Sequence, residues 1–348
     1  MKRSSIGNTG IILPPVVFGT SALGNLYNAL TEETKLEIVS ECFKYVSRPV
    51  VFDSAGKYGA GLALEMLGKC LDKLGIKENE VIISNKLGWL RKELTTPEPT
   101  FEPGVWRNLK HDAYMDISAE GIMKCFEQGN ELLGGKYRPQ LLSIHDPDEY
   151  INLGVTESEK EKRMQDIIEG YETLLQLKKE GKVQAIGIGA KDWKIIRVLA
   201  ERIDFDWVMF ANSLTIMQQP FELLKFMNEL HEKGVSIINS AVFHSGFLTG
   251  GNFFDYKPVS SSNPVDAKRL AWREKFFKLC EKHSVSPAVA CVNFAMTAPG
   301  VAAISLNTSN PAHVKSNVAS VAANVNSDFY KEMITSGLLD ASYPYLQV

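Results

Sequence analysis

Residues 49–59 read PVVFDSAGKYG, residues 81–88 read VIISNKLG and residues 141–148 read LLSIHDPD. Each stretch is a short apolar run that ends on polar residues, which is typical of a buried strand followed by a turn. If the three runs are parallel strands of one barrel, their C-terminal ends meet at one face. That face would gather a carboxylate, a phenol, an ammonium and an imidazole, which suit proton and hydride transfer at a carbonyl carbon. The four residues are Asp53, Tyr58, Lys86 and His145.

Strand-like runs alternate with helical periodicity about eight times along the chain. Thr31, followed by three residues that favour a helix start, predicts one helix, and the apolar spacing over 158–180 predicts another that ends at Gly181. This alternation predicts an α/β protein with a parallel sheet. A (β/α)8 TIM barrel is favoured over an open doubly wound sheet, because no G-x-G-x-x-G follows the first strand. The expected strands are 16–20, 50–54, 81–86, 141–145, 185–189, 207–212, 236–241 and 301–306.

Two regions lie outside the repeating pattern. Residues 2–13 contain GNTG between β-prone pieces and predict an N-terminal β-hairpin that closes the bottom of the barrel. Residues 90–114 are rich in Pro, Thr and aromatics and are too long for an ordinary connection, so they predict a long loop at the C-terminal face. Trp89 and Trp106 are candidate walls of a substrate pocket, or they only pin this loop; the sequence leaves both readings open.

Composition limits the classes of protein and partner. The 348 residues carry 38 Lys and Arg against 41 Asp and Glu and contain no run of five like charges, so nucleic acid is not expected as a partner. The five cysteines form no C-x-x-C pair and no uninterrupted apolar segment is long enough for a bilayer, so we expect a cytoplasmic protein without a membrane span. We expect one domain, 1–348, with a small-molecule partner; the oligomeric state is not predictable.

No metal-binding pattern is present among the six histidines. There is neither an H-E-x-x-H sequence nor a His/Cys/Asp cluster with ligand spacing, so a metal site is not expected. His244 is expected in a loop and His283 on a helix surface.

The ordinary chemistry of the four polar side chains suggests a catalytic role for each of them. A free tyrosine has a pKa of about 10, so Tyr58 needs a nearby cation such as Lys86 to favour its phenolate as a base. Asp53 would pair with Lys86 and offset the cost of burying it. His145 would hydrogen-bond the reacting oxygen and so contact substrate. Each residue alone is more often a cap, a packed ring or a solvated side chain; the combination points to catalysis.

In order and strand placement, these four residues resemble the catalytic tetrad of the aldo-keto reductase superfamily, and the likeness extends over nearly the whole chain. Three further stretches resemble the aldose 1-dehydrogenase branch, which includes L-fucose, D-threo-aldose and L-galactose dehydrogenases: HDPDEY at 145–150, VWRNLKHDAY at 105–114 and INSAVFHSGFLTGG at 238–251. The resemblance implies oxidation of a sugar at its anomeric carbon with a nicotinamide cofactor.

The resemblance also implies where a dinucleotide would bind. Phe243 would stack on the nicotinamide or pack in the core, and Ser245 and Gly246 would lie beside the pyrophosphate. Asn307 and His313 stand where relatives that prefer NADP usually place Lys and Arg, which favours NAD, although Lys315 is close by. The remaining implied cofactor positions are Gly19, Thr20, Asp53, Asn212, Leu248 and Asn317.

One departure from the superfamily pattern concerns the nicotinamide contacts. GIGAKDW at 187–193 lacks the usual Ser-Asn after the fifth strand, and Gly189, Ala190 and Lys191 stand there instead. We expect an oxidoreductase that converts an aldopyranose to its aldonolactone with NAD, NADP being possible. The alternatives are an NADPH-dependent aldehyde or carbonyl reductase, including pyridoxal-type substrates, and a nicotinamide-binding module without turnover.

Overall fold

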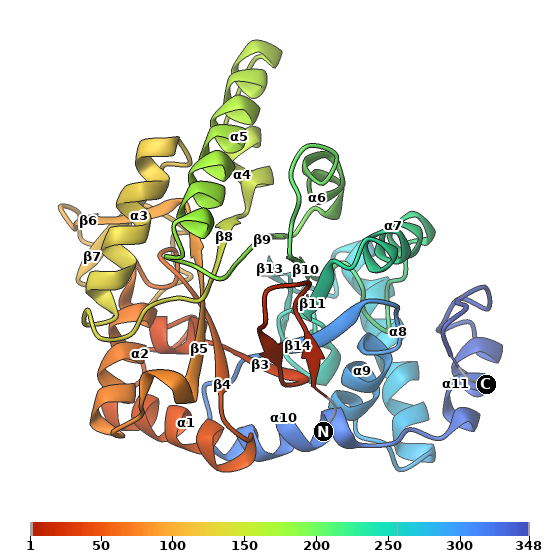
Figure 1. The fold of residues 1–348 in the computed structure, drawn as a ribbon. Helices are drawn as coiled ribbons and strands as arrows, with labels where there is room; N and C mark the ends of the chain where they lie inside the picture. The colour runs from red at the N-terminus through yellow and green to blue at the C-terminus, as the bar shows by residue number, and fades with distance from the viewer. Residues whose placement is uncertain (1–2, 256, 347–348) are drawn as a thin grey trace.

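The computed structural model describes residues 3–255 and 257–346. Its centre is a closed barrel of eight parallel strands (Figure 1), in which each strand pairs with the next along the chain and the last pairs with the first. The strand bounds differ from the predicted ones by at most one residue, and the predicted (β/α)8 barrel is confirmed. The strands are β3 (Val16–Gly19), β4 (Val50–Ala55), β5 (Val81–Leu87), β8 (Leu141–His145), β9 (Ala185–Ala190), β10 (Trp207–Ala211), β11 (Ser236–Ser240) and β14 (Val301–Leu306).

Helices cover the outside of the barrel and begin where the sequence supplies caps. The Thr31 side chain accepts a hydrogen bond from the Thr34 amide at the start of the first helix, and Gly181 follows the fifth helix with φ of 72°. Both predicted helix boundaries are confirmed to within one residue. The helices are α1 (Glu32–Tyr45), α2 (Leu62–Lys73), α3 (Ala119–Leu132), α4 (Pro147–Asn152), α5 (Glu157–Lys179), α6 (Trp193–Leu199), α7 (Phe221–Glu232), α8 (Pro264–Lys282), α9 (Pro287–Ala295), α10 (Ala312–Ala322) and α11 (Ser327–Thr335).

The N-terminal hairpin closes one end of the barrel, as predicted. β1 (Ser4–Ser5) and β2 (Ile12–Leu13) pair antiparallel, and the turn between them contains two glycines with positive φ. Ile6, Ile11 and Leu13 are buried and pack with residues of the barrel interior, Val17 and Trp207 among them. Burying one such aliphatic side chain contributes roughly 1.5–3 kcal/mol to the free energy of unfolding. The three side chains therefore hold the hairpin firmly against this end of the barrel.

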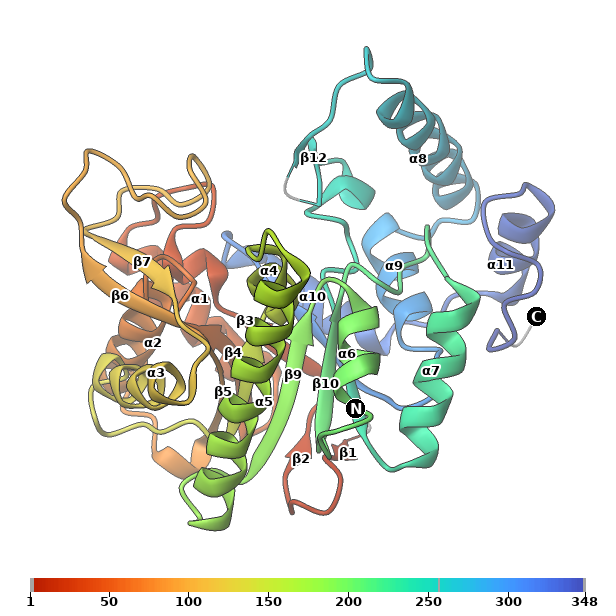
Figure 2. The ribbon, with the colours of Figure 1, turned by 90° about the horizontal axis from the view of Figure 1, so that it is seen from above.

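The opposite end carries the irregular segments (Figure 2). The segment 90–114, expected as a loop, contains two antiparallel strands, β6 (Trp89–Glu93) and β7 (His111–Met115), so only its middle is irregular. A second short pair, β12 (Phe253–Phe254) and β13 (Lys257–Pro258), follows β11. The described residues also contain three short 3-10 helices, Ser21–Gly24, Glu78–Glu80 and Phe247–Thr249. Within the described residues, no helix combines the length and the apolar character that a membrane crossing requires.

Candidate active site

The four predicted residues come together at the C-terminal end of neighbouring strands. β4 and β5 pair so that Asp53 lies opposite Ser84 and the next inward-facing pair brings in Lys86. The Lys86 ammonium donates to the Asp53 carboxylate, whose other oxygen accepts from the Ser84 hydroxyl at 3.0 Å. The Lys86 nitrogen lies 4.8 Å from the centre of the Tyr58 ring, and the His145 ring meets the same tyrosine edge-on at 5.5 Å. The barrel therefore brings Asp53, Lys86 and His145 together beside Tyr58.

Burial sets the protonation of the site. The Asp53 and Lys86 side chains are each only 3% exposed, so each ion depends on the other for compensation of its charge. Burial, together with the charges of Asp53 and Asp146, raises the pKa of Tyr58 well above its usual value. Burial also lowers the pKa of His145 well below its usual value. At neutral pH the phenol and the imidazole are both uncharged, and each can donate or accept a hydrogen bond.

The expectation that Lys86 favours the Tyr58 phenolate stays a prediction, because burial raises the pKa of Tyr58 even with the Lys86 ammonium beside the ring. The Lys86 ammonium is paired with the Asp53 carboxylate, and the negative charge of Asp53 offsets much of the effect of Lys86 on the phenol. The charges of Lys57 and Lys191 lower the pKa of Tyr58, and burial outweighs both of them. At neutral pH the phenol is therefore protonated in most molecules, and the smaller phenolate fraction can accept a proton.

A cavity of about 650 Å³ opens above the four groups, all of which line it. Leu26, Glu102, Val105 and Trp106 form its wall on the side of the β6–β7 segment. Trp89 is not among the lining residues. Its ring packs against Phe101 at 5.7 Å between centres, so Trp89 pins the segment and Trp106 forms the wall.

Most of the predicted cofactor positions line the same cavity, which extends from the four polar groups toward β14 and α10. Thr20, Asn212 and Leu248 do not line it. The Thr20 hydroxyl donates to the Asp53 carbonyl at 3.0 Å, and Leu248 is fully buried in the main core. The predicted residues that do line the cavity are Gly19, Asp53, Phe243, Ser245, Gly246, Asn307, His313 and Asn317.

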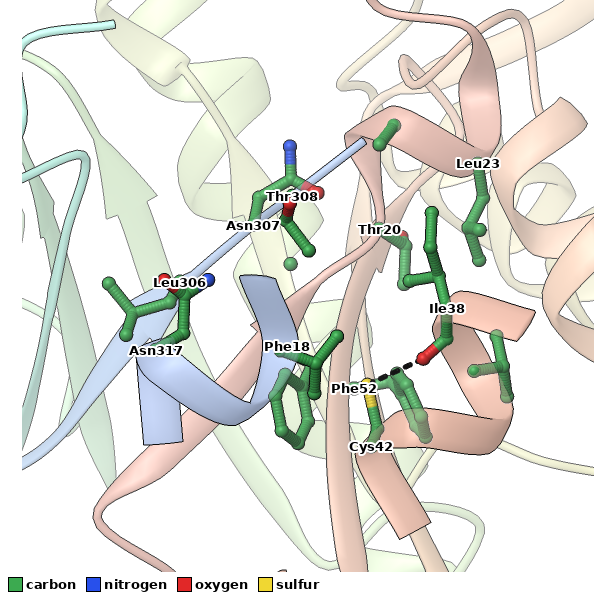
Figure 3. A pocket seen from close by; sticks show the side chains of 14 residues that line it. Phe18, Thr20, Leu23, Ile38, Cys42, Phe52, Leu306, Asn307, Thr308 and Asn317 are labelled. Carbon is green, nitrogen blue, oxygen red and sulfur yellow. Dashed lines mark hydrogen bonds between the residues drawn. The ribbon is translucent and has the colours of Figure 1, made fainter. Parts of the chain in front are cut away.

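At the far end of the cavity, a small apolar crevice separates the turn after β3 and α1 from the segment after β14 and α10 (Figure 3). Asn307, Thr308 and Asn317 lie on one side of this crevice, and Thr20 and Ile38 lie on the other. The Asn307 amide donates to the Ser21 hydroxyl at 2.9 Å and joins the two sides. A Cβ atom on Gly19 would lie 3.3 Å from the Asn307 Cβ, so a larger residue there would narrow the cavity.

The end of β11 and the segment after it line the cavity with residues 240–243, 245, 246 and 249. Ala241, His244 and Ser245 have φ values of 54°, 47° and 57°, a backbone conformation that residues with a side chain rarely adopt. The His244 ring is fully buried: Nδ1 lies 2.8 Å from Asp255 Oδ1 and Nε2 lies 2.9 Å from Thr215 Oγ1. His244 is in a loop, as expected, but its side chain is buried and connects Asp255 with Thr215. His283, at the end of α8, pairs with Glu332.

The cavity fits a nicotinamide dinucleotide. Polar and apolar residues both line it, and the aromatic ring of Phe243 lies among the lining residues together with Ser245 and Gly246. The Asn212 Oδ1 atom is buried next to the lining residue Ala211 and has no hydrogen-bond partner among the described residues. Such an acceptor is suited to an amide N–H₂ group, as on a nicotinamide carboxamide.

Sequence reasoning missed a charged network beside the tetrad. Lys57, Asp146, Glu149 and Lys191 pair with one another, and three of them line the cavity. Lysines and glutamates in loops are usually solvated, so the only available signal was the position of Lys57 directly before Tyr58. No group of three or more His, Cys, Asp or Glu side chains suited to a metal ion occurs in the described part of the chain.

Comparison with known proteins gives the family context. Residues 15–335 match the sequence model of the aldo/keto reductase family. The chain is 25% identical to a pyridoxal 4-dehydrogenase of Microbacterium luteolum, with 97% of this chain and 98% of the relative covered. It is 23% identical to a D-threo-aldose 1-dehydrogenase of a Pseudomonas species, with 95% and 96% covered. The solved structure of a glycerol dehydrogenase from Gluconobacter oxydans superposes with a TM-score of 0.69 at 18% identity, covering 99% of this chain and 98% of that one.

Proposed function

Because the chain belongs to the aldo/keto reductase family, we propose that it oxidises an aldopyranose at the anomeric carbon to the aldonolactone with a nicotinamide cofactor. The observation that carries the proposal is the buried Asp53–Lys86 pair, Tyr58 and His145 at one end of a single cavity of about 650 Å³. The similarity to a D-threo-aldose 1-dehydrogenase over nearly the whole chain supports the substrate class. L-fucose, D-arabinose and L-galactose are the sugars we expect to react.

Each of the four residues has a defined task in this proposal. Tyr58, in its phenolate form, accepts the proton of the anomeric hydroxyl, and His145, uncharged at neutral pH, hydrogen-bonds the same oxygen and orients the sugar. The Asp53–Lys86 pair keeps one fixed cation under the tyrosine ring. A bound nicotinamide supplies the hydride acceptor. Trp106 offers an apolar face on which a sugar ring can pack.

A second candidate is the reduction of an aldehyde or ketone. The raised pKa of Tyr58 favours it, because a neutral phenol is ready to give a proton to the oxygen of a carbonyl that is being reduced. The similarity to a pyridoxal 4-dehydrogenase adds pyridoxal to the substrates that deserve a trial. A binding module without turnover is disfavoured by the complete set of four residues.

We propose NAD as the preferred cofactor. Asn307 and His313 line the cavity near the N-terminus of α10, whereas Lys315 is exposed and is not among the lining residues. A 2′-phosphate is best held by fixed positive charge, which this end of the cavity lacks among its described lining residues. We also propose that the chain is one domain, since α11 packs on α8 beside the barrel, and that it works in the cytoplasm, since all five cysteines are free and buried.

The test is to measure the dissociation constants of NAD and NADP separately and then to assay initial rates. The three sugars and pyridoxal are offered with the oxidised cofactors, and a panel of aldehydes is offered with the reduced ones. Turnover of a sugar with NAD supports the proposal. Turnover of aldehydes alone assigns the reductase function instead. Cofactor binding without turnover of any substrate refutes both.

A further inference from the structure

Lys57, which directly precedes Tyr58, is a lysine whose side chain is only 3% exposed. Its ammonium group contacts three carboxylates: Glu102 at 3.0 Å, Asp146 at 3.2 Å and Glu149 at 2.7 Å. Burial alone would lower the pKa of Lys57, but these three carboxylates outweigh burial and raise it, so the group stays charged. Burying these charges costs free energy of desolvation, and this cost is offset only while the ammonium and the three carboxylates stay in close contact.

The three carboxylates come from separate parts of the C-terminal face. Glu102 lies in the irregular middle of the β6–β7 segment, Asp146 directly follows β8, and Glu149 is in α4. Lys191, directly after β9, extends the set through contacts of 2.6 Å to Glu149 and 3.5 Å to Asp146. Lys57 thus ties the β4–α2 connection, which carries Tyr58, to the segment that forms the wall of the cavity.

Glu102 passes this constraint on to Trp106. Its second carboxylate oxygen accepts a hydrogen bond of 2.7 Å from the Trp106 indole N–H. The Trp106 ring lies 5.9 Å from the Tyr58 ring between centres, and both residues line the cavity. Glu102 also has φ of 44°, a strained backbone conformation that persists where surrounding contacts impose it. Lys57, Glu102 and Trp106 therefore form one connected chain of contacts around the tyrosine.

We propose that Lys57 is a positioning residue that, through Glu102, holds Trp106 as the substrate-facing wall beside Tyr58 and so sets the KM for substrate. This inference rests on the proposed function, because it assumes that the substrate is bound at Tyr58. Lys57 does not itself exchange a proton with the substrate. Loss of the contact lets Trp106 and its segment move away from the tyrosine, which weakens substrate binding and leaves the cofactor end of the cavity intact.

The test compares Lys57→Met, Glu102→Gln, the double variant and Lys57→Arg with the unmodified protein. Loss of one charge-assisted contact of this kind is expected to raise KM by on the order of 10- to 100-fold. Glu102→Gln should do so with a much smaller change in kcat, whereas Lys57→Met should also lower kcat, because the Lys57 charge lowers the pKa of Tyr58. Because both residues act through one contact, the double variant should resemble the stronger single variant. Lys57→Arg keeps the charge and should recover most of the affinity. The dissociation constant of NAD, followed by protein fluorescence, should not change.

Lys92→Met is the matched control. Lys92 is a lysine on β6 that pairs with Asp112 at 3.3 Å, on the same segment but outside the lining of the cavity. It should leave KM unchanged. Hydrogen exchange of the amides over residues 98–108 gives a readout that needs no substrate: Lys57→Met should speed exchange there, and Lys92→Met should do so much less.

Unchanged KM and unchanged exchange in Lys57→Met would overturn the inference. So would a fall in thermal stability with KM and kcat both retained, since that result assigns Lys57 a structural role only. If Lys57→Met does not fold, Glu102→Gln decides the question from the other side of the contact. Failure of the unmodified protein to turn over any substrate refutes the proposed function, while the exchange measurement still decides whether Lys57 holds the segment.

Discussion

Replacing Asp53 with Asn leaves the Lys86 ammonium buried without its counter-ion. Both side chains are only 3% exposed, although both line the cavity, so each charge depends mainly on the other for compensation. Breaking a buried pair by removing one partner costs about 3–5 kcal/mol of the free energy of unfolding. With an unfolding entropy of about 2.1 cal/mol/K per residue, a chain of 348 residues should lose about 4–7 °C in Tm.

The assay is urea unfolding followed by tryptophan fluorescence, with Tm measured in parallel. The double variant Asp53→Asn with Lys86→Met removes both charges and should recover part of the loss, because no buried charge remains. Glu274→Gln is the control for an exposed pair: Glu274 and Lys278 lie 2.8 Å apart on α8 and are both largely exposed. It should leave the free energy of unfolding nearly unchanged. An Asp53→Asn variant as stable as this control would refute the view that the pair is a buried ion pair.

Three further outcomes are expected. His244→Asn should raise the dissociation constant of NAD, because the buried His244–Asp255 contact supports the segment that carries Phe243, Ser245 and Gly246; His283→Asn, which alters a remote His–Glu332 contact, should not. Although burial opposes it, hydrogen bonds from Thr100 and Ala113 lower the pKa of Asp112 from 3.8 to about 2, so its stabilisation is present above pH 3.8 and is lost as pH falls toward 2. Unfolding midpoints of Asp112→Asn should therefore fall less steeply than those of the unmodified protein over that range. The pKa of Tyr58 is raised well above its ordinary value of 10, so the phenolate fraction rises throughout the range from pH 7 to 9. Because the phenolate is the base, kcat for sugar oxidation should rise about tenfold per pH unit over this range. A kcat that does not change with pH would contradict Tyr58 as the base.

The barrel could be predicted because its strands carry a strong and local signal. Runs such as VVF and VII are apolar on both faces, and their bounds are set by polar residues and turns that follow directly. The positions of Asp53, Lys86 and His145 at strand ends fix their meeting point once the barrel is assumed. Thr31 and Gly181 fixed helix ends for the same local reason.

The rest depends on contacts between segments that are far apart in the chain. The strands β6 and β7 are short and partly polar, and Pro-rich sequence separates them, so their antiparallel pairing has little local signal. Lys57, Glu102 and Glu149 are each unremarkable in sequence; only the fold brings them within 3.0 Å. The raised pKa of Tyr58 likewise follows from burial, which the motif alone did not reveal.

Tyr58→Phe tests the central claim most directly, because it removes one hydroxyl and keeps the ring that packs between Trp106 and His145. The measurement is kcat on the best substrate together with the dissociation constant of the cofactor. We predict that kcat falls by about 10²- to 10⁴-fold while the dissociation constant stays the same. A variant that keeps its full kcat would contradict proton exchange by this hydroxyl.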